Sequence, residues 1–445
     1  MKQVSRFYNL MEYYSLNHNA KNVSFLTAVR NGLAPDKGLY FPKDIPQLDT
    51  EFISNLPQLT NHEIALQVIR PFIGDDIPEK QLEKIIRDTL NFDFPLIKIS
   101  ESIAALELFH GPTLAFKDVG ARFMARCLSY AYSLQNKEQL TVLVATSGDT
   151  GGAVADGFYK VKGINVVILY PKGKVSPLQE KQLTTLGENV SALEVEGTFD
   201  DCQEMVKSAF IDAELKSNIA LTSANSINIA RWLPQMFYYF FAYKNRPNPY
   251  KKLLISVPSG NFGNICAGLL AQKMGLPIEH FIASTNANNT VSSFLDSGTY
   301  VPKKSIQTLS NAMDVGDPSN FIRIQKIFNN DFLKLKKRLT AYSYSDKETV
   351  NALKEIYSLS NYIAEPHGAI GYIGLKSFMD SQEKRENLQG IFLETAHPIK
   401  FSETVESALK TKINVPESLQ ELLRRKKSSI PISTYNQLKL FLLKN

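Results

Sequence analysis

The sequence predicts an α/β protein in which two domains with parallel sheets follow an N-terminal domain. The first observation is the length, because 445 residues are too many for one ordinary hydrophobic core. The second is an alternation of short apolar runs with helical stretches from about residue 140 onward, which is typical of parallel sheets. We expect the three domains to span residues 1–95, 96–245 and 246–445.

The N-terminal domain is predicted from segments that lack this alternation. Residues Gly32 to Pro42 are rich in turn-forming residues, and Glu79 to Leu90 have the spacing of an amphipathic helix. We therefore expect a separate domain, or an elaborate lead-in, before the first strand.

The later strands are predicted from apolar, β-branched runs, each followed by a helical stretch. These runs are Leu140–Thr146, Ile164–Tyr170, Val190–Val195, Lys252–Pro258 and Gly390–Thr395. Ligands of parallel sheets bind beyond the carboxyl ends of strands. We therefore expect the functional residues in the strand-to-helix turns.

Composition excludes several classes of function. A net charge of +6 spread over this length is too weak to favour nucleic acid binding. The three cysteines are far apart and form no CxxC pair, so we expect neither a metal site nor a disulfide framework. No apolar run reaches the length of a membrane helix or of a signal peptide. We expect a soluble, cytoplasmic protein without a membrane partner.

Lys117 is the first candidate for chemistry. It follows the small, apolar residues Leu114, Ala115 and Phe116. A lysine held in an apolar pocket has a lowered pKa and can act as a nucleophile. We expect the next residue, Asp118, to cap the following helix.

The turn from Pro258 to Asn264 is a candidate phosphate site. Its glycines permit close approach of the backbone, and a helix begins just after it, so free N–H groups can meet an anion. The candidate residues are Gly260, Asn261, Phe262, Gly263 and Asn264. A tight turn without a ligand is the alternative. The absence of GxGxxG and of a Walker lysine disfavours a dinucleotide or ATP.

The turn from Thr146 to Gly152 concentrates hydroxyls and backbone amides at a helix start. Such a nest suits a small anion, for example a carboxylate. The candidate residues are Thr146, Ser147, Asp149 and Thr150. The alternative is a simple helix cap formed by Asp149 or Thr150.

The turn from Glu394 to Pro398 places Thr395 at a strand end, where its hydroxyl can meet a ring nitrogen. His397 in this turn could be a general base, but we expect it to be structural, as we do His110 and His367.

The stretch from Ser223 to Trp232 alternates polar and apolar residues. Asn225 and Ser226 belong to this pattern, Asn228 and Arg231 would share a helix face, and Arg231 could hold a second phosphate. A polar helix face with a surface arginine is the alternative.

Together these features fit pyridoxal phosphate. That cofactor needs a lysine for its aldehyde, a cradle for its phosphate and a partner for its pyridine nitrogen.

The lysine segment "LAFKDVGA" resembles that of the fold-type II pyridoxal-phosphate enzymes, whose fold is like that of the tryptophan synthase β subunit. Further segments resemble the longer subgroup of the threonine synthase family, and they occur in that family's order. These segments are "SFLTAVRNGLAPDKGLYFP", "HGPTLAFKD", "ATSGDTGGA", "NSINIAR", "SGNFGN", "TLSNAMDVGDPSNF" and "ETAHPIKF".

The resemblance implies a role for each matching position. Lys117 would bind the cofactor covalently, the turn from Gly260 to Asn264 would hold its phosphate, and Thr395 would meet its ring nitrogen. Ser147, Asp149 and Thr150 would surround the substrate carboxylate and the cofactor's ring oxygen. The phosphate of the substrate would bind to Asn225, Ser226 and Arg231.

The implied reaction converts O-phospho-L-homoserine and water to L-threonine and phosphate. A neutral Thr395 would leave the cofactor a mild electron sink. The alternatives are a threonine or serine dehydratase, or a phospho-lyase that releases a 2-keto acid. We expect a monomer or homodimer. The looser match near the N-terminus leaves a substrate role for Ser15 in doubt.

Overall fold

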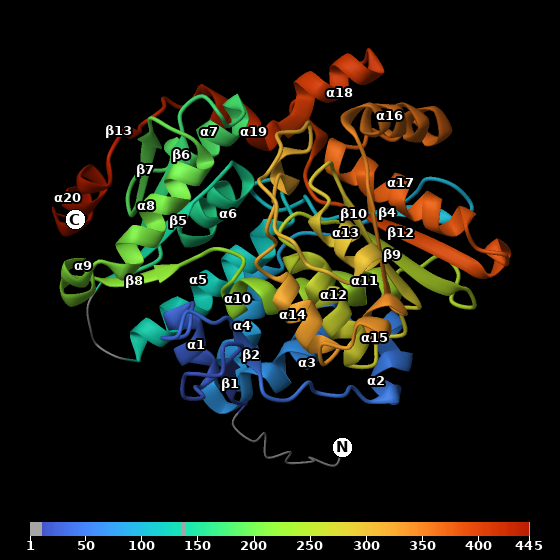
Figure 1. The fold of residues 1–445 in the computed structure, drawn as a ribbon, viewed down its shortest axis with the longest axis horizontal. Coiled ribbons are helices and arrows are strands. Elements are labelled where there is room, and N and C mark those ends of the chain that lie inside the picture. The colour runs from blue at the N-terminus through green and yellow to red at the C-terminus, as the bar shows by residue number, and fades with distance from the viewer. Residues whose placement is uncertain (1–10, 135–138, 445) are drawn as a thin grey trace.

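Two β-sheets form the centre of the molecule, and helices pack against both (Figure 1). The structure is a computed structural model that describes residues 11–134 and 139–444. The first sheet has five strands in the order β13-β7-β6-β5-β8, and the second has six in the order β11-β10-β9-β12-β4-β3. The predicted α/β class with two largely parallel sheets is confirmed.

The five-stranded sheet is parallel throughout, and its central strands are aliphatic and buried on both faces, as helix-covered parallel strands require. Its strands are β5 (Leu140–Ala145), β6 (Ile164–Pro171), β7 (Val190–Val195), β8 (Ala220–Ser223) and β13 (Ile430–Ile432). The helices between β5 and β8 are α6 (Asp149–Phe158), α7 (Pro177–Thr184), α8 (Phe199–Ile211) and α9 (Ala213–Asn218).

The six-stranded sheet is parallel except at one edge, where β3 runs antiparallel to β4. Its strands are β3 (Leu96–Lys98), β4 (Ile103–Glu107), β9 (Lys252–Pro258), β10 (His280–Thr285), β11 (Leu339–Ser343) and β12 (Leu388–Glu394). The α-helices between β9 and β12 are α12 (Gly263–Lys273), α13 (Thr290–Ser297), α14 (Phe321–Ile327), α15 (Phe332–Lys336), α16 (Asp346–Ser360) and α17 (Pro366–Asp380).

Two segments pair into a sheet other than the one formed by the strands nearest to them in the sequence. Strands β3 and β4 come before the whole five-stranded sheet in sequence but pair into the other one, with Ile103 opposite Gly390. Conversely, the chain passes from β12 through α18 (Ser402–Leu409) and α19 (Glu417–Arg424) back to the first sheet (Figure 1), where β13 pairs with β7 and α20 (Tyr435–Lys444) follows. The sheets therefore do not coincide with the predicted ranges 96–245 and 246–445.

The N-terminal part lies below both sheets in Figure 1. Strand β1 (Tyr13–Ser15) pairs antiparallel with β2 (Tyr40–Pro42). Around them lie α1 (Phe25–Asn31), α2 (Thr50–Asn55), α3 (Asn61–Ile73) and α4 (Glu79–Thr89). Helix α4 confirms the amphipathic helix predicted over Glu79 to Leu90.

Three further helices lie at the centre of the molecule: α5 (Lys117–Ser133), α10 (Ile229–Trp232) and α11 (Phe237–Lys244). The first six residues of α11 are buried, which is why this helix is apolar on every side. Within the described part of the chain, no helix is long and apolar enough to cross a membrane.

Candidate active site

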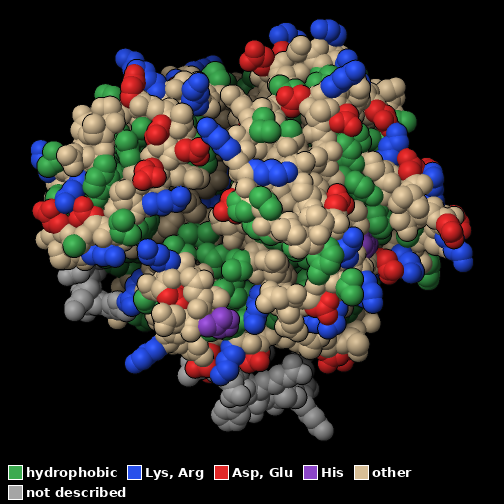
Figure 2. Space-filling view, viewed as in Figure 1, with side chains coloured by type: hydrophobic (Ala, Val, Ile, Leu, Met, Phe, Trp, Pro, Cys, Tyr) green, Lys and Arg blue, Asp and Glu red, His purple; other side chains and the backbone are tan. Residues whose placement is uncertain are grey.

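One cavity of about 1580 Å³ collects the residues that the sequence singled out. The strand-to-helix turns of both sheets line it, together with residues 30–37 of the N-terminal part. Nine Lys and Arg residues line it against four Asp residues, so the cavity favours an anionic ligand. Figure 2 shows Lys and Arg side chains around a hollow near the middle of the molecule. The predicted residues in its lining are Lys117, Thr146, Ser147, Asp149, Thr150, Asn225, Ser226, Arg231, Gly260, Asn261, Phe262, Gly263, Asn264 and Thr395.

Lys117 is the first residue of α5, and backbone hydrogen bonds bring it next to the end of β12. The N–H of Phe116 donates to the carbonyl oxygen of Thr395 at 2.8 Å, and the N–H of His397 donates to that of Leu114 at 3.1 Å. Leu114 has a left-handed backbone, with φ 56°, a conformation that costs energy for a branched residue. The loop is therefore held in a strained shape that fixes the start of α5 against the turn after β12, and Lys117 and Thr395 line the same cavity.

The Lys117 amine is suited to react as a nucleophile. Part of the side chain is accessible, because it lines the cavity. No group in the described part of the chain forms a hydrogen bond with the amine. Burial lowers the pKa of Lys117, and the charges of Lys400 and Arg231 lower it further, although Asp149 and Glu365 act in the opposite direction. A lowered pKa increases the fraction of neutral amine.

The prediction that Asp118 caps α5 is wrong. No side chain caps this helix. Instead, the buried Asp118 carboxylate accepts a hydrogen bond from the N–H of Thr113 at 2.9 Å and a shorter one from its hydroxyl. Asp118 therefore closes the loop that leads to Lys117.

The turn after β9 has the features of an anion cradle. Phe262 has a left-handed backbone with φ 58°, and α12 begins at Gly263, so the first N–H groups of this helix have no carbonyl partner within it. The buried Asn264 Nδ2 also has no hydrogen-bond partner in the described part of the chain. A Cβ on Gly260 would lie 2.7 Å from Met313 Cα, so only glycine fits there.

The Asn261 side chain serves a different purpose. Its Nδ2 donates to Ser226 Oγ at 2.6 Å, and its Oδ1 accepts from the N–H of Ser319 at 2.6 Å. It therefore fastens this turn to the stretches around residues 226 and 319 and leaves its backbone for an anion.

The turn after β5 is organised by Thr146. Its buried hydroxyl accepts hydrogen bonds from the N–H groups of Gly148 and Gly151, at 2.9 and 2.8 Å. The Ser147 and Thr150 side chains are partly accessible from the cavity. Neither Asp149 nor Thr150 caps α6, so the capping alternative is wrong.

Asp149 is paired with Lys400, which the sequence did not single out. Both side chains are buried, and Lys400 Nζ lies 2.6 Å from Asp149 Oδ1. Gln179 Nε2 donates to the same oxygen at 3.0 Å. Although burial alone would raise it, the pKa of Asp149 falls well below its usual range because of Lys400 and Lys117. Asp149 therefore remains ionised.

The guanidinium group of Arg231 is buried. It is 3% exposed, one nitrogen donates to the carbonyl oxygen of Ala224 at 2.5 Å, and Nε has no partner in the described part of the chain. Burial lowers the pKa of Arg231 to about 10. Asn228 is the N-cap of α10 and also donates to the carbonyl oxygen of Val29, so its role is structural. The exposed polar helix face considered above is excluded.

The histidines differ from one another. His397 caps a short 3₁₀ turn, and burial lowers its pKa to about 4. His110 pairs with Glu107 outside the cavity. His367 lines the cavity and contacts Glu365. The sequence did not assign either residue to the site. Ser15 donates to Asp36 and does not line the cavity.

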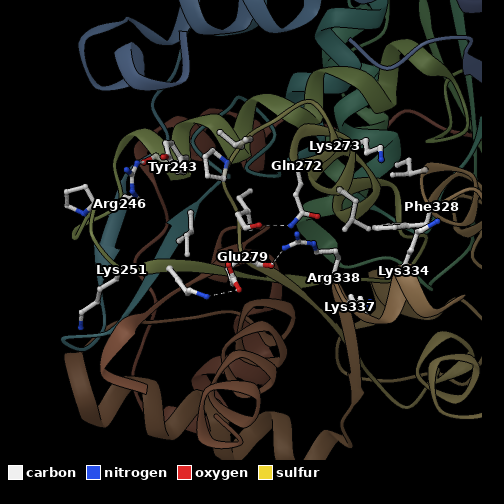
Figure 3. Close-up of a pocket in the computed structure, with 18 of the residues that line it drawn as sticks. Tyr243, Arg246, Lys251, Gln272, Lys273, Glu279, Phe328, Lys334, Lys337 and Arg338 are labelled. Carbon is white, nitrogen blue, oxygen red and sulfur yellow. Dashed lines mark hydrogen bonds and ion pairs between the residues drawn. The ribbon is translucent and has the colours of Figure 1, made fainter. Parts of the chain in front are cut away.

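A second hollow, of about 650 Å³, is shown in Figure 3. Tyr243, Gln272 and Arg338 help to line it, and Glu279 there pairs with Lys252 at 3.0 Å. None of the predicted site residues lines this hollow. The larger cavity is therefore the candidate active site.

Comparisons with known proteins agree with this geometry. A family model described as pyridoxal-phosphate dependent enzyme matches residues 95–390, and models of the threonine synthase N terminus and C-terminal part match residues 12–90 and 369–441. The threonine synthase of Buchnera aphidicola from Acyrthosiphon pisum is 46% identical over 443 residues, which cover 97% of this chain and 100% of that one. The chain belongs to the threonine synthase family.

Solved structures of this family superpose on nearly the whole chain. The crystal structure of threonine synthase from Escherichia coli is 42% identical, with a TM-score of 0.90 over 98% of this chain and 100% of that one. The pyridoxal-phosphate-bound threonine synthase from Brucella melitensis is 35% identical, with a TM-score of 0.91 over 98% and 99%. The chain is therefore a pyridoxal-phosphate-dependent carbon–oxygen lyase with the fold of the type II enzymes.

Proposed function

We propose that this chain converts O-phospho-L-homoserine and water to L-threonine and phosphate, the last step of threonine biosynthesis. The observation that carries the proposal is the cavity itself. It combines an amine that forms no hydrogen bond within residues 11–134 and 139–444, an anion cradle at a helix start and a separate buried guanidinium. Two anion sites in one cavity suit a phosphorylated cofactor and a phosphorylated substrate.

The residues present fit the cofactor. Lys117 holds its aldehyde, and the backbone of residues 260–264, with the unpartnered Asn264 Nδ2, holds its phosphate. Thr395 lines the same cavity as Lys117 and would meet the ring nitrogen. Asp149 would lie near the ring oxygen, with its charge offset by Lys400.

The substrate binds between two turns. Hydroxyls and N–H groups at Ser147 and Thr150 bind its carboxylate, whereas Thr146 shapes the turn, because the N–H groups of Gly148 and Gly151 already use its hydroxyl. Arg231, with Asn225 and Ser226, binds its phosphate. The unpartnered Arg231 Nε supports this assignment.

Lys117 performs the proton transfers. Pyridoxal phosphate, when bound, withdraws electrons from the substrate Cα. With cofactor and substrate bound, the free Lys117 amine would be a base next to the substrate Cα. Its lowered pKa keeps it able to accept that proton. A second proton then leaves Cβ, which expels the phosphate from Cγ, where Arg231 would stabilise it. Cγ gains a proton to become the methyl group, water adds at Cβ, and Lys117 returns a proton to Cα.

Product analysis with O-phospho-L-homoserine tests the proposal. We expect threonine and phosphate in equal amounts from the wild-type holoenzyme. A Lys117→Ala variant should form neither, whereas Lys160→Ala, at an exposed position, should match the wild type. Phosphate with a 2-keto acid would identify a phospho-lyase instead. A keto acid from unphosphorylated threonine or serine would identify a dehydratase.

We also propose that the protein acts in the cytoplasm as a monomer or homodimer. The three buried free cysteines suit a reducing compartment. Sedimentation of the purified protein measures its oligomeric state.

A further inference from the structure

Arg323, on α14, is a buried cation to which the site described above gives no role. It is fully buried, and it forms no ion pair with a carboxylate in the described part of the chain. Burial lowers the pKa of Arg323 to about 10, which still leaves it charged at neutral pH. A buried charge without a countercharge is tolerated only where its hydrogen bonds offset the cost, so the partners of these bonds indicate its role.

The guanidinium group of Arg323 joins three separate parts of the chain. Nη1 donates to Asn320 Oδ1 at 2.8 Å, and Nη2 donates to the carbonyl oxygens of Tyr40 at 3.0 Å and Ile227 at 2.6 Å. Tyr40 belongs to β2 of the N-terminal part, whereas Ile227 lies just before α10. A planar guanidinium can bind these partners together because its N–H groups point in fixed, divergent directions.

Arg323 also contacts the far end of α10, the helix that carries Arg231. Its guanidinium carbon lies 4.5 Å from the centre of the Trp232 ring, which is a cation–π contact. Helix α10 has only four residues, so it has little stability of its own. The Arg323 side chain therefore holds this segment near both of its ends.

Asn320 extends these contacts to the anion cradle. Its Nδ2 donates to the carbonyl oxygen of Asn261 at 3.1 Å and to Ser226 Oγ at 3.4 Å. A guanidinium can only donate, so the atom of Asn320 that faces Arg323 is the amide oxygen. Arg323 therefore fixes which way the Asn320 amide points, and leaves its nitrogen for the cradle and for Ser226.

The Ser226 hydroxyl is oriented by this arrangement. Its oxygen accepts from Asn320 Nδ2 and from Asn261 Nδ2, which occupies both lone pairs. The O–H of Ser226 donates to no group in the described part of the chain, and Ser226 lines the cavity. An oriented donor without an acceptor suits an anion such as a phosphate.

We propose that Arg323 is a positioning residue for the phosphate of the substrate. It fixes Asn320, which leaves the Ser226 hydroxyl to donate to that phosphate. It also holds the short helix from which Arg231 reaches the same group. The inference rests on the proposed function, and it assigns Arg323 no contact with substrate or cofactor.

An Arg323→Lys variant tests this role, because lysine keeps the buried charge but cannot bind three separated acceptors in a fixed fork. Calorimetric titration of the holoenzyme with inorganic phosphate and, separately, with L-threonine gives two dissociation constants. L-threonine lacks a phosphate group, so it reports on the rest of the site. We expect Arg323→Lys to weaken phosphate binding roughly 10-fold and to change L-threonine binding by less than about twofold. The matched variant Arg338→Lys, at an exposed position, should change neither.

Equal weakening of phosphate and L-threonine binding would overturn the inference, because Arg323 would then act on the fold as a whole. Phosphate binding that is unchanged in a folded Arg323→Lys variant would overturn it as well.

Hydrogen exchange in the wild-type holoenzyme gives an answer even if the variant does not fold. No residue of α14 lines the cavity, so we expect phosphate bound there to reach this helix through Ser226 and Asn320. Inorganic phosphate should slow amide exchange across residues 321–327 and leave residues 332–336 of α15 unchanged. No change across residues 321–327 would overturn the inference.

Failure of the proposed function has a different signature. A wild-type holoenzyme that forms no threonine from O-phospho-L-homoserine would contradict that function. The dependence of phosphate binding on Arg323 would still be measured in the same protein, because neither the titration nor the exchange experiment requires turnover.

Discussion

Lys400 and Asp149 form a buried ion pair, with 2.6 Å between Nζ and Oδ1. Lys400 also donates to the carbonyl oxygen of Thr113 at 2.8 Å. The pair therefore joins the lysine loop, the turn after β5 and the turn after β12, which are separated by up to 287 residues in the sequence.

Removing the cation of this pair should destabilise the protein strongly. In Lys400→Met the Asp149 charge is left buried without its partner, which costs about 3–5 kcal/mol. Urea unfolding of the apoprotein measures the loss. The double variant Asp149→Asn/Lys400→Met should recover part of it, because no charge is stranded.

An exposed pair serves as the control. Lys98 and Glu101 are mostly in solvent, so Lys98→Met should cost less than about 1 kcal/mol. If Lys400→Met were no less stable than Lys98→Met, the Lys400–Asp149 pair would not hold the three turns together.

Lys117 and Lys400 should differ in reactivity toward the cofactor. Lys117 has a lowered pKa and no hydrogen-bond partner in the described part of the chain, whereas Lys400 forms an ion pair with Asp149. Borohydride reduces a bond between lysine and the cofactor aldehyde to a stable amine. Peptide mass mapping of the reduced holoprotein should find the modification on Lys117. Finding it on Lys400 would mean that the electrostatic argument assigns the wrong lysine.

Arg231 should matter for the substrate and not for cofactor loading. Hydrogen bonds to a charged group contribute about 1.5–3 kcal/mol, so Arg231→Ala should raise KM by roughly 10- to 100-fold. Inhibition by inorganic phosphate should weaken by a similar factor, while the cofactor content per chain stays at the wild-type level.

Lys207 offers the matched control for Arg231, since it also lines the cavity but lies on α8. Lys207→Ala removes the same charge and should change KM much less. Loss of cofactor from Arg231→Ala would instead place this side chain at the cofactor phosphate.

Candidate site residues could be predicted from the sequence where their role depends on the residue types next to them. Lys117 after an apolar run, and the glycine- and hydroxyl-rich turns at strand ends, are visible in short stretches. Lys400 and Glu365 were missed because their environment arises from packing between distant segments. Nothing adjacent in sequence distinguishes Lys400 from a surface lysine.

Two side chains had the right location but a different use. Thr146 and Asn261 line the cavity, yet their polar atoms hold turns together. Strand β4 was missed because its pairing with β12 joins segments that are far apart in sequence. Contiguous domain ranges could not represent such an exchange between sheets.

Asp118 should make stability depend on pH. Burial raises its pKa to about 6 from the ordinary 3.8, even though the hydrogen bonds from Thr113 oppose this. Between these two values the folded state keeps a proton that the unfolded state has released, so raising the pH favours unfolding. The loss amounts to about 3 kcal/mol once the pH exceeds 6.

An Asp118→Asn variant isolates this contribution, because asparagine does not titrate and can still accept from the N–H of Thr113. Free energies of unfolding of variant and wild type should be measured from pH 4 to 7. Their difference should shift in favour of the variant by about 3 kcal/mol over this range, and then level off. A difference that is independent of pH would show that Asp118 titrates at its ordinary value, and hence that the loop before Lys117 opens to solvent.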